Sequence, residues 1–176
     1  TKEEKNAIEI IMARKSVRSY TSRPVEKEKV DIMLKAAMAA PSAVNKQPWA
    51  FIVIDDRDVL NKLAEVLPYA KMTAEAPMAI VVCGDLAKSL NGEFGKYWML
   101  DCSAASENLL LVAEALELGA VWTAIYPEEQ RIENVRKVLS LPEHIVPFNL
   151  IPIGYPQRNE EAKDKFKQEN IHYNQW

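Results

Sequence analysis

Two stretches near the start of the chain carry apolar side chains at helical spacing. The apolar residues are Ile8, Ile11 and Met12 in residues 2–14, and Val30, Met33, Leu34, Ala37 and Met38 in residues 26–40. Apolar groups three or four residues apart lie on one face of a helix. The pattern therefore predicts an amphipathic helix over each stretch.

Four short apolar runs predict strands, because they are rich in β-branched residues and bounded by polar ones. They cover residues 49–54, 78–84, 120–125 and 145–153. Two prolines interrupt the last run. Since proline cannot donate a hydrogen bond to a neighbouring strand, this run is predicted to be an edge strand or an irregular one.

Three further segments show helical signals. Asp55 and Asp56 are suitable N-caps for a helix after the first strand, and Pro127 opens another helix. Residues 97–118 are apolar around most of the helix circumference, which predicts a central helix that Gly119 ends. At ~1.5 Å per residue this helix is ~30 Å long, so we expect part of it to lie at a subunit interface.

A segment bracketed by two prolines, residues 40–49, joins the second helix to the first strand. It is poor in charge and contains Ser42, Asn45 and Gln47. Because proline restricts the residue before it, we interpret the segment as a stiff extended loop that presents hydroxyl and amide groups to a heteroatom-rich ligand. The alternative is a rigid connector that binds nothing.

Basic residues follow the first helix and recur near the C-terminus. In an extended chain, Arg14, Ser16 and Arg18 lie on one side, where two guanidinium groups and a hydroxyl suit a phosphate. Lys163 and Lys165 repeat the spacing of two residues. The alternative for both groups is a solvated basic surface.

The composition adds mainly exclusions. The chain has 176 residues, of which 48% are hydrophobic and 27% charged, with a net charge of -3. These values predict one domain over residues 1–176 and disfavour nucleic-acid binding. Two cysteines without a Cys-x-x-Cys pair indicate a reducing, cytoplasmic setting. The sequence has no uninterrupted apolar run of ~18 residues, so we expect neither a signal peptide nor a membrane span.

Motifs that carry chemistry of their own are missing from the sequence. The five glycines form neither a dinucleotide fingerprint nor a Walker loop, and no G-x-S-x-G elbow surrounds Ser42. His144 and His172 lie far apart without ligand spacing, so we expect no metal site. A chain that holds a phosphorylated ligand without an evident acid, base or nucleophile suits a cofactor enzyme, because a flavin supplies the reactive atom.

Four segments together resemble the nitroreductase family of FMN-dependent oxidoreductases. They are residues 13–18, 40–49, 76–77 and 153–156. The resemblance implies an α+β fold with three layers, α-β-α, in which helices flank a central, mostly antiparallel sheet. It also implies a homodimer with the long helix at its interface and two shared FMN sites. Residues 157–176 are then an arm that docks on the partner subunit.

The resemblance also implies which residues contact FMN. Those at the phosphate and the polar side of the flavin are Arg14, Lys15, Ser16, Arg18, Lys163 and Lys165. Those that reach the flavin from the other subunit are Pro41, Ser42, Ala43, Asn45 and Gln47. Thr123 and Ala124 occupy the place of a turn that faces flavin N5.

The implied reaction is a ping-pong transfer of hydride from NADH or NADPH through flavin N5 to a small acceptor, such as a nitroaromatic, a quinone or a flavin. The chemistry rests on FMN, so no side chain is assigned as catalytic. Two alternatives stay open. One is an FMN-binding storage or sensor protein without significant turnover, and the other is a structural or interaction domain without FMN.

Overall fold

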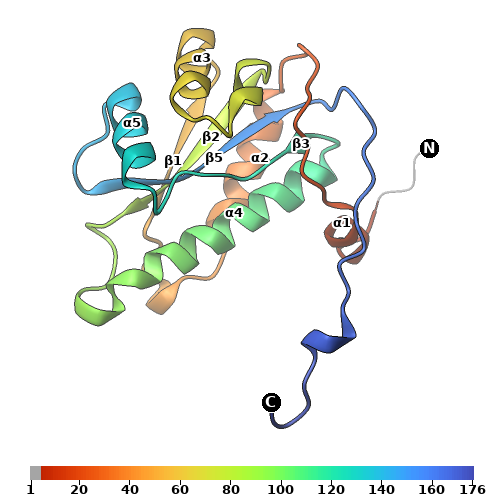
Figure 1. Ribbon diagram of the computed structural model, residues 1–176, viewed down its shortest axis with the longest axis vertical. Helices are drawn as coiled ribbons and strands as arrows, with labels where there is room; N and C mark the ends of the chain where they lie inside the picture. The colour runs from red at the N-terminus through yellow and green to blue at the C-terminus, as the bar shows by residue number, and fades with distance from the viewer. Residues whose placement is uncertain (1–4) are drawn as a thin grey trace.

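A sheet lies between two layers of helices in the computed structural model, which describes residues 5–176 (Figure 1). α2 (Lys27–Met38) and α4 (Tyr97–Ala115) cover one face of the sheet. α3 (Arg57–Val66) and α5 (Glu129–Leu139) cover the other. The short helix α1 (Ala7–Ala13) packs beside α4. This is the α+β, three-layer arrangement that the resemblance implies.

The strand order is β1 (Trp49–Ile54), β2 (Met78–Asp85), β5 (Ile145–Gly154) and β3 (Gly119–Ala120), and β4 (Thr123–Ala124) also pairs with β5. All four strand pairings are antiparallel. Successive residues of a strand point to opposite faces. In β2, Val82 packs in the α2 and α4 layer while Val81 packs in the α3 and α5 layer. A strand covered on both faces is apolar at every position, which explains why its run was easy to recognise.

β5 lies inside the sheet, so the edge position predicted for it is wrong, whereas its predicted irregularity is confirmed. Its register with β2 shifts between Val82 and Cys83, which leaves Phe148 as an extra residue on β5. Pro152 lies opposite the gap between β3 and β4, where no ladder hydrogen bond is required of it. The strand predicted over residues 120–125 is broken at this gap, although β3 and β4 keep the same register with β5.

The helix ends follow local hydrogen bonding. The Asn6 side chain accepts hydrogen bonds from two backbone N–H groups and starts α1. Residues 2–4 of the helix predicted over residues 2–14 lie outside the described residues. Asp56 caps α3 as predicted, since its Oδ1 accepts from Val59 N at 3.0 Å. α4 ends before the predicted stop, because Glu117 takes a φ of 62° and Leu118 N donates to Ala113 O.

The C-terminal arm, residues 157–176, runs away from the body of the molecule (Figure 1). All of its residues are exposed, including Trp176, which is 100% exposed. Among residues 5–176, no helix combines the length and the apolar character that crossing a bilayer requires.

Candidate functional site

The basic segment, residues 14–18, is extended and lies along the edge of the sheet. Ser16 forms a parallel bridge with Ala120, and Val17 N donates to Ala120 O at 3.0 Å. Val17 is buried, at 2% exposure, against Tyr20 and Ala76. Because neighbouring side chains alternate in an extended chain, the burial of Val17 turns those of Ser16 and Arg18 outward.

The basic segment and the C-terminal arm line one cleft of about 310 Å³. Its lining residues are Arg14, Lys15, Ser16, Arg18, Glu160, Glu161, Lys163 and Lys165. The structure thus brings together all six residues that the resemblance assigns to the phosphate and the polar side of the flavin. The cleft carries five cationic side chains and two carboxylates on this list, so its balance is positive.

Two of these cations are tied to α4. Lys15 Nζ lies 3.1 Å from Glu114 Oε2, and Arg14 Nε lies 3.8 Å from Glu107 Oε1. Within the part of the chain that the structure describes, Arg18, Lys163 and Lys165 form no ion pair, and we call them the three unpaired cations. Guanidinium and ammonium groups without a partner favour a bound anion, and phosphate accepts several such hydrogen bonds at once.

The proline-bracketed loop is a tight turn, so the extended form predicted for it is wrong. Residues Ala43–Asn45 form a 3₁₀ turn (η1), and Val44, Asn45 and Gln47 have φ angles of 52°, 54° and 49°. Ser42 Oγ accepts from Gln47 N at 2.9 Å, and Gln47 Nε2 donates to Asn45 Oδ1 at 2.9 Å. The loop therefore uses its polar side chains partly to hold its own shape. These hydrogen bonds support the stiffness that the prolines predict.

Within one chain the loop and the cleft lie at opposite ends of α4. Ala43 N donates to Asp101 Oδ1 at 2.9 Å near the start of this helix. The cleft lies at its far end, where Lys15 meets Glu114. From the rise per residue of an α-helix, Asp101 and Glu114 are about 20 Å apart along α4. A single chain therefore does not unite the two halves of the predicted site.

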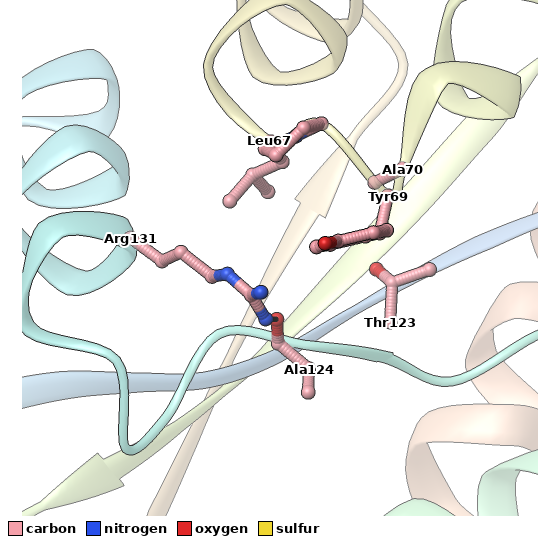
Figure 2. Close-up of a pocket in the computed structure, with 7 residues that line it drawn as sticks. Leu67, Tyr69, Ala70, Thr123, Ala124 and Arg131 are labelled. Carbon is pink, nitrogen blue, oxygen red and sulfur yellow. Dashed lines mark hydrogen bonds between the residues drawn. The ribbon is translucent and has the colours of Figure 1, made fainter.

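Thr123 and Ala124 lie in a third place, on β4 (Figure 2). They line a pocket of about 10 Å³ together with Tyr69 and Arg131, a volume close to that of one water molecule. Thr123 Oγ1 donates to Leu150 O at 2.6 Å, and Arg131 donates to Ala124 O at 3.1 Å while its guanidinium lies 5.0 Å from the Tyr69 ring centroid. Neither residue lines the basic cleft.

Sequence reasoning missed four acidic residues of the cleft and its surroundings. Glu160 and Glu161 line the cleft, and Glu107 and Glu114 hold Arg14 and Lys15 from α4. Glu107 and Glu114 are seven residues apart and share one face of the helix predicted over residues 97–118. Nothing in the sequence places that face beside Arg14 and Lys15. Glu160 and Glu161 lie in a stretch of mixed charge that gave no signal either.

The comparisons with known proteins agree on one family. The family model described as the nitroreductase family matches residues 11–68 and 63–155. A protein of Methanothermobacter thermautotrophicus that carries the provisional name NADH dehydrogenase/NAD(P)H nitroreductase is 47% identical over 171 residues, which cover 97% of this chain and 88% of that protein.

Two solved structures are similar over nearly the whole chain. The one from Bacteroides thetaiotaomicron, with the same provisional name, has a TM-score of 0.92 and 53% identity and covers 97% of this chain and 98% of its own. An FMN-dependent nitroreductase from Clostridium difficile has a TM-score of 0.87 and 30% identity, with coverage of 96% and 99%.

Proposed function

This chain belongs to the nitroreductase family, and from that premise we propose that it transfers a hydride from NAD(P)H to a small acceptor such as a nitroaromatic, a quinone or a flavin. It is an NAD(P)H-dependent oxidoreductase with FMN as its cofactor. The proposed order of reaction is ping-pong, in which the oxidised nicotinamide leaves before the acceptor enters. The observation that carries the proposal is the basic cleft beside the sheet edge.

The donors of the cleft fit the phosphate of FMN. The three unpaired cations offer charge without having to break an existing ion pair, and Ser16 adds a hydroxyl. A phosphate monoester carries close to two negative charges at neutral pH, which the positive balance of the cleft complements. The cleft has room for a phosphate and part of the chain attached to it, since its volume is about 310 Å³.

FMN, when bound, supplies the ring that takes up hydride from NAD(P)H and passes it to the acceptor. The side chains of this protein bind and orient. We assign the phosphate to the three unpaired cations and to Ser16. Arg14 and Lys15, which Glu107 and Glu114 hold in place, are assigned to the polar side of the ring.

We propose that the site is completed by a second copy of this chain. The loop at the start of α4 and the cleft at its end are too far apart for one FMN to reach both within a subunit. A homodimer packed along α4 brings the loop of one subunit to the cleft of the other. The residues then donated across the interface are Pro41, Ser42, Ala43, Asn45 and Gln47.

Exposed apolar side chains support this dimer. Ile8, Ile11 and Met12 on α1 and Leu100 on α4 are exposed, and α1 packs beside α4. Exposed apolar groups on two helices that pack side by side favour an interface. The arm adds Phe166, Tyr173 and Trp176, all exposed, and we propose that it docks on the partner.

Thr123 and Ala124 are proposed to face flavin N5 through their backbone. The Thr123 hydroxyl is already used by Leu150 O, and the Ala124 carbonyl accepts from Arg131. A backbone N–H needs no particular side chain, so the identities of Thr123 and Ala124 do not oppose this role. We also propose a reducing, cytoplasmic setting, because both cysteines are buried and unpaired.

Steady-state kinetics tests the proposed reaction. Rates are measured over a grid of NADPH and menadione concentrations, and then with NADH and a nitroaromatic. Parallel double-reciprocal lines, together with loss of activity when FMN is removed and its recovery when FMN is restored, support the proposal. An FMN-loaded protein that oxidises neither nucleotide with any of these acceptors would instead favour storage or sensing.

A further inference from the structure

The root of the arm is paired with the chain that follows the basic segment. Thr21 N donates to Tyr155 O at 2.9 Å, and Gln157 N donates to Ser19 O at 3.1 Å. Between these two bonds, Tyr20 and Pro156 form an antiparallel bridge. This pairing sets where the arm begins relative to the cleft.

Beyond this root the arm has little else to hold it. Within residues 5–176, the hydrogen bonds of residues 158–176 all stay inside the arm, such as Phe166 N to Asp164 Oδ1 at 2.9 Å. The arm nevertheless supplies two of the three unpaired cations, Lys163 and Lys165. The root is therefore the last place at which hydrogen bonds among the described residues tie the chain that carries these lysines to the body of the molecule.

The Tyr155 side chain connects the root to two helices. Its hydroxyl donates to Glu26 Oε2 at 2.6 Å and accepts from Lys29 Nζ at 2.8 Å. Glu26 is the N-cap of α2, and Lys29 also donates to Leu116 O at 2.9 Å, directly after α4. One hydroxyl thus joins the arm root to the ends of both helices of this layer.

The Tyr155 ring is held as firmly as its hydroxyl. The Arg23 guanidinium lies 3.9 Å from the ring centroid, and Lys29 Nζ lies 4.9 Å from it. Arg23 also donates to Glu26 Oε1 at 2.7 Å. Two cations, one carboxylate and one aromatic ring therefore satisfy one another without using any residue that lines the cleft.

We propose that Tyr155 is a positioning residue for the anion cleft, which fixes the arm root so that Lys163 and Lys165 face Arg18. The inference rests on the proposed function, since it takes the anion to be the phosphate of FMN. Tyr155 itself does not line the cleft. Its effect is to keep the lysines near Arg18 before the ligand arrives, which lowers the cost of ordering them on binding.

Riboflavin lacks the phosphate of FMN. Comparing the two ligands therefore separates a role of Tyr155 in positioning the phosphate-binding lysines from a general role in flavin binding. Their equilibrium dissociation constants are measured by flavin fluorescence for the wild type, Tyr155→Phe and Tyr155→Ala. We expect the wild type to bind FMN more tightly than riboflavin. Tyr155→Ala should reduce that preference about tenfold, as expected for a lost charge-assisted contact, while riboflavin affinity is unchanged. Tyr155→Phe keeps the ring beneath Arg23 and should retain part of the preference.

The matched control uses two ion pairs of the same spacing. Arg23→Ala removes a pair with Glu26, and Lys88→Ala removes a pair with Asp85, each between residues three apart. Only Arg23→Ala should reduce the preference for FMN. An unchanged preference in both Tyr155 variants, or an equal loss of FMN and riboflavin affinity, would overturn the inference. If Tyr155→Ala does not fold, the preference of Tyr155→Phe for FMN over riboflavin decides whether the inference stands.

The same measurement keeps the two proposals distinguishable. A wild type that binds FMN no better than riboflavin would overturn the phosphate assignment and, with it, the role of Tyr155. A wild type that prefers FMN, with Tyr155 variants that share the full preference, would leave the proposed function in place and remove only the positioning role.

Discussion

Val17 is the residue that orients the basic segment. Its side chain fills the space against Tyr20 and Ala76, and its N–H bonds Ala120 O. The close approach also explains Gly119, because a Cβ there would lie 2.6 Å from Val17 Cγ1. One buried side chain therefore fixes which neighbours point into the cleft, and no charged residue has to do so.

Arg18→Ala tests the phosphate assignment at a single residue. Removing one unpaired cation should weaken FMN binding by ~1.5–3 kcal/mol, the usual contribution of a hydrogen bond to a charged group, and leave riboflavin binding unchanged. Isothermal titration calorimetry measures the binding free energies of FMN and riboflavin. Lys88→Ala serves as the control, since it removes a surface cation outside the cleft. An FMN affinity equal to that of the wild type would show that Arg18 is ordinary surface.

The two cysteines should be unreactive in the folded protein. Burial raises the pKa of the Cys83 thiol to about 12 and raises the pKa of Cys102 as well. Since folding raises both values, the protonated thiols favour the folded state fully below the ordinary pKa of 9.0 and lose this effect as the pH rises toward about 12. Titration with a thiol reagent at neutral pH should label neither cysteine before unfolding and both after it. Labelling of the native protein would contradict this burial.

At the scale of elements, one aspartate starts α3. Asp56→Ala should destabilise the protein by ~0.5–2 kcal/mol, because Val59 N loses its acceptor. Asp55→Ala is the matched control, since no hydrogen bond from Asp55 to this helix start is observed among residues 5–176. The urea concentrations at the midpoint of unfolding are compared for the two variants. Equal midpoints for the two variants would show that the cap contributes nothing measurable.

Apolar runs predict the elements well, whereas the prolines of β5 do not reveal its place in the sheet. β2 is buried along its whole length, and β1 is partly buried, with apolar residues packed on both faces of each strand, so both apolar runs are recognisable in the sequence. Pro147 and Pro152 predict an edge position or an irregular strand for β5, and the irregular strand is what forms, since its bulge and the gap between β3 and β4 accommodate the prolines. Such compensation lies in the neighbouring strands, so the proline positions alone could not reveal it.

The turn form of the loop was not predictable from its residues. Positive φ angles are usual for glycine, but here Val44, Asn45 and Gln47 adopt them. The hydrogen bonds from Gln47 to Ser42 and Asn45, and from Ala43 to Asp101, hold this geometry. The last bond comes from a residue far along the chain, which a local pattern does not contain.

At the scale of the whole molecule, α4 lies between two groups of residues that the resemblance assigns to different subunits. The six residues expected at the phosphate and the polar side of the flavin line one cleft, because the basic segment and the arm root are paired. The loop meets the other end of α4. Spacing along the sequence carries no information on which end of a helix a loop reaches, so the distance between the two groups within one chain is known only from the structure.

Leu100→Asp tests whether the site needs two chains. Leu100 is 63% exposed on α4, so a carboxylate there should leave the folded subunit intact but oppose burial in an interface. We expect a shift from dimer to monomer in analytical ultracentrifugation, with loss of bound FMN. Ile32→Asp, at an exposed position of α2, is the control, and this variant should remain a dimer and retain bound FMN. A monomer that retains FMN fully would contradict a site completed by a second copy.

The central claim is that this protein uses FMN to oxidise NAD(P)H, and anaerobic reduction of the purified holoprotein tests it most directly. NADH and NADPH are added in turn under anaerobic conditions while the visible absorption of the flavin is followed in a stopped-flow instrument. We expect at least one nucleotide to bleach the oxidised flavin band and a quinone added afterwards to restore it. A flavin that stays oxidised in the presence of both nucleotides would contradict the proposed oxidation of NAD(P)H.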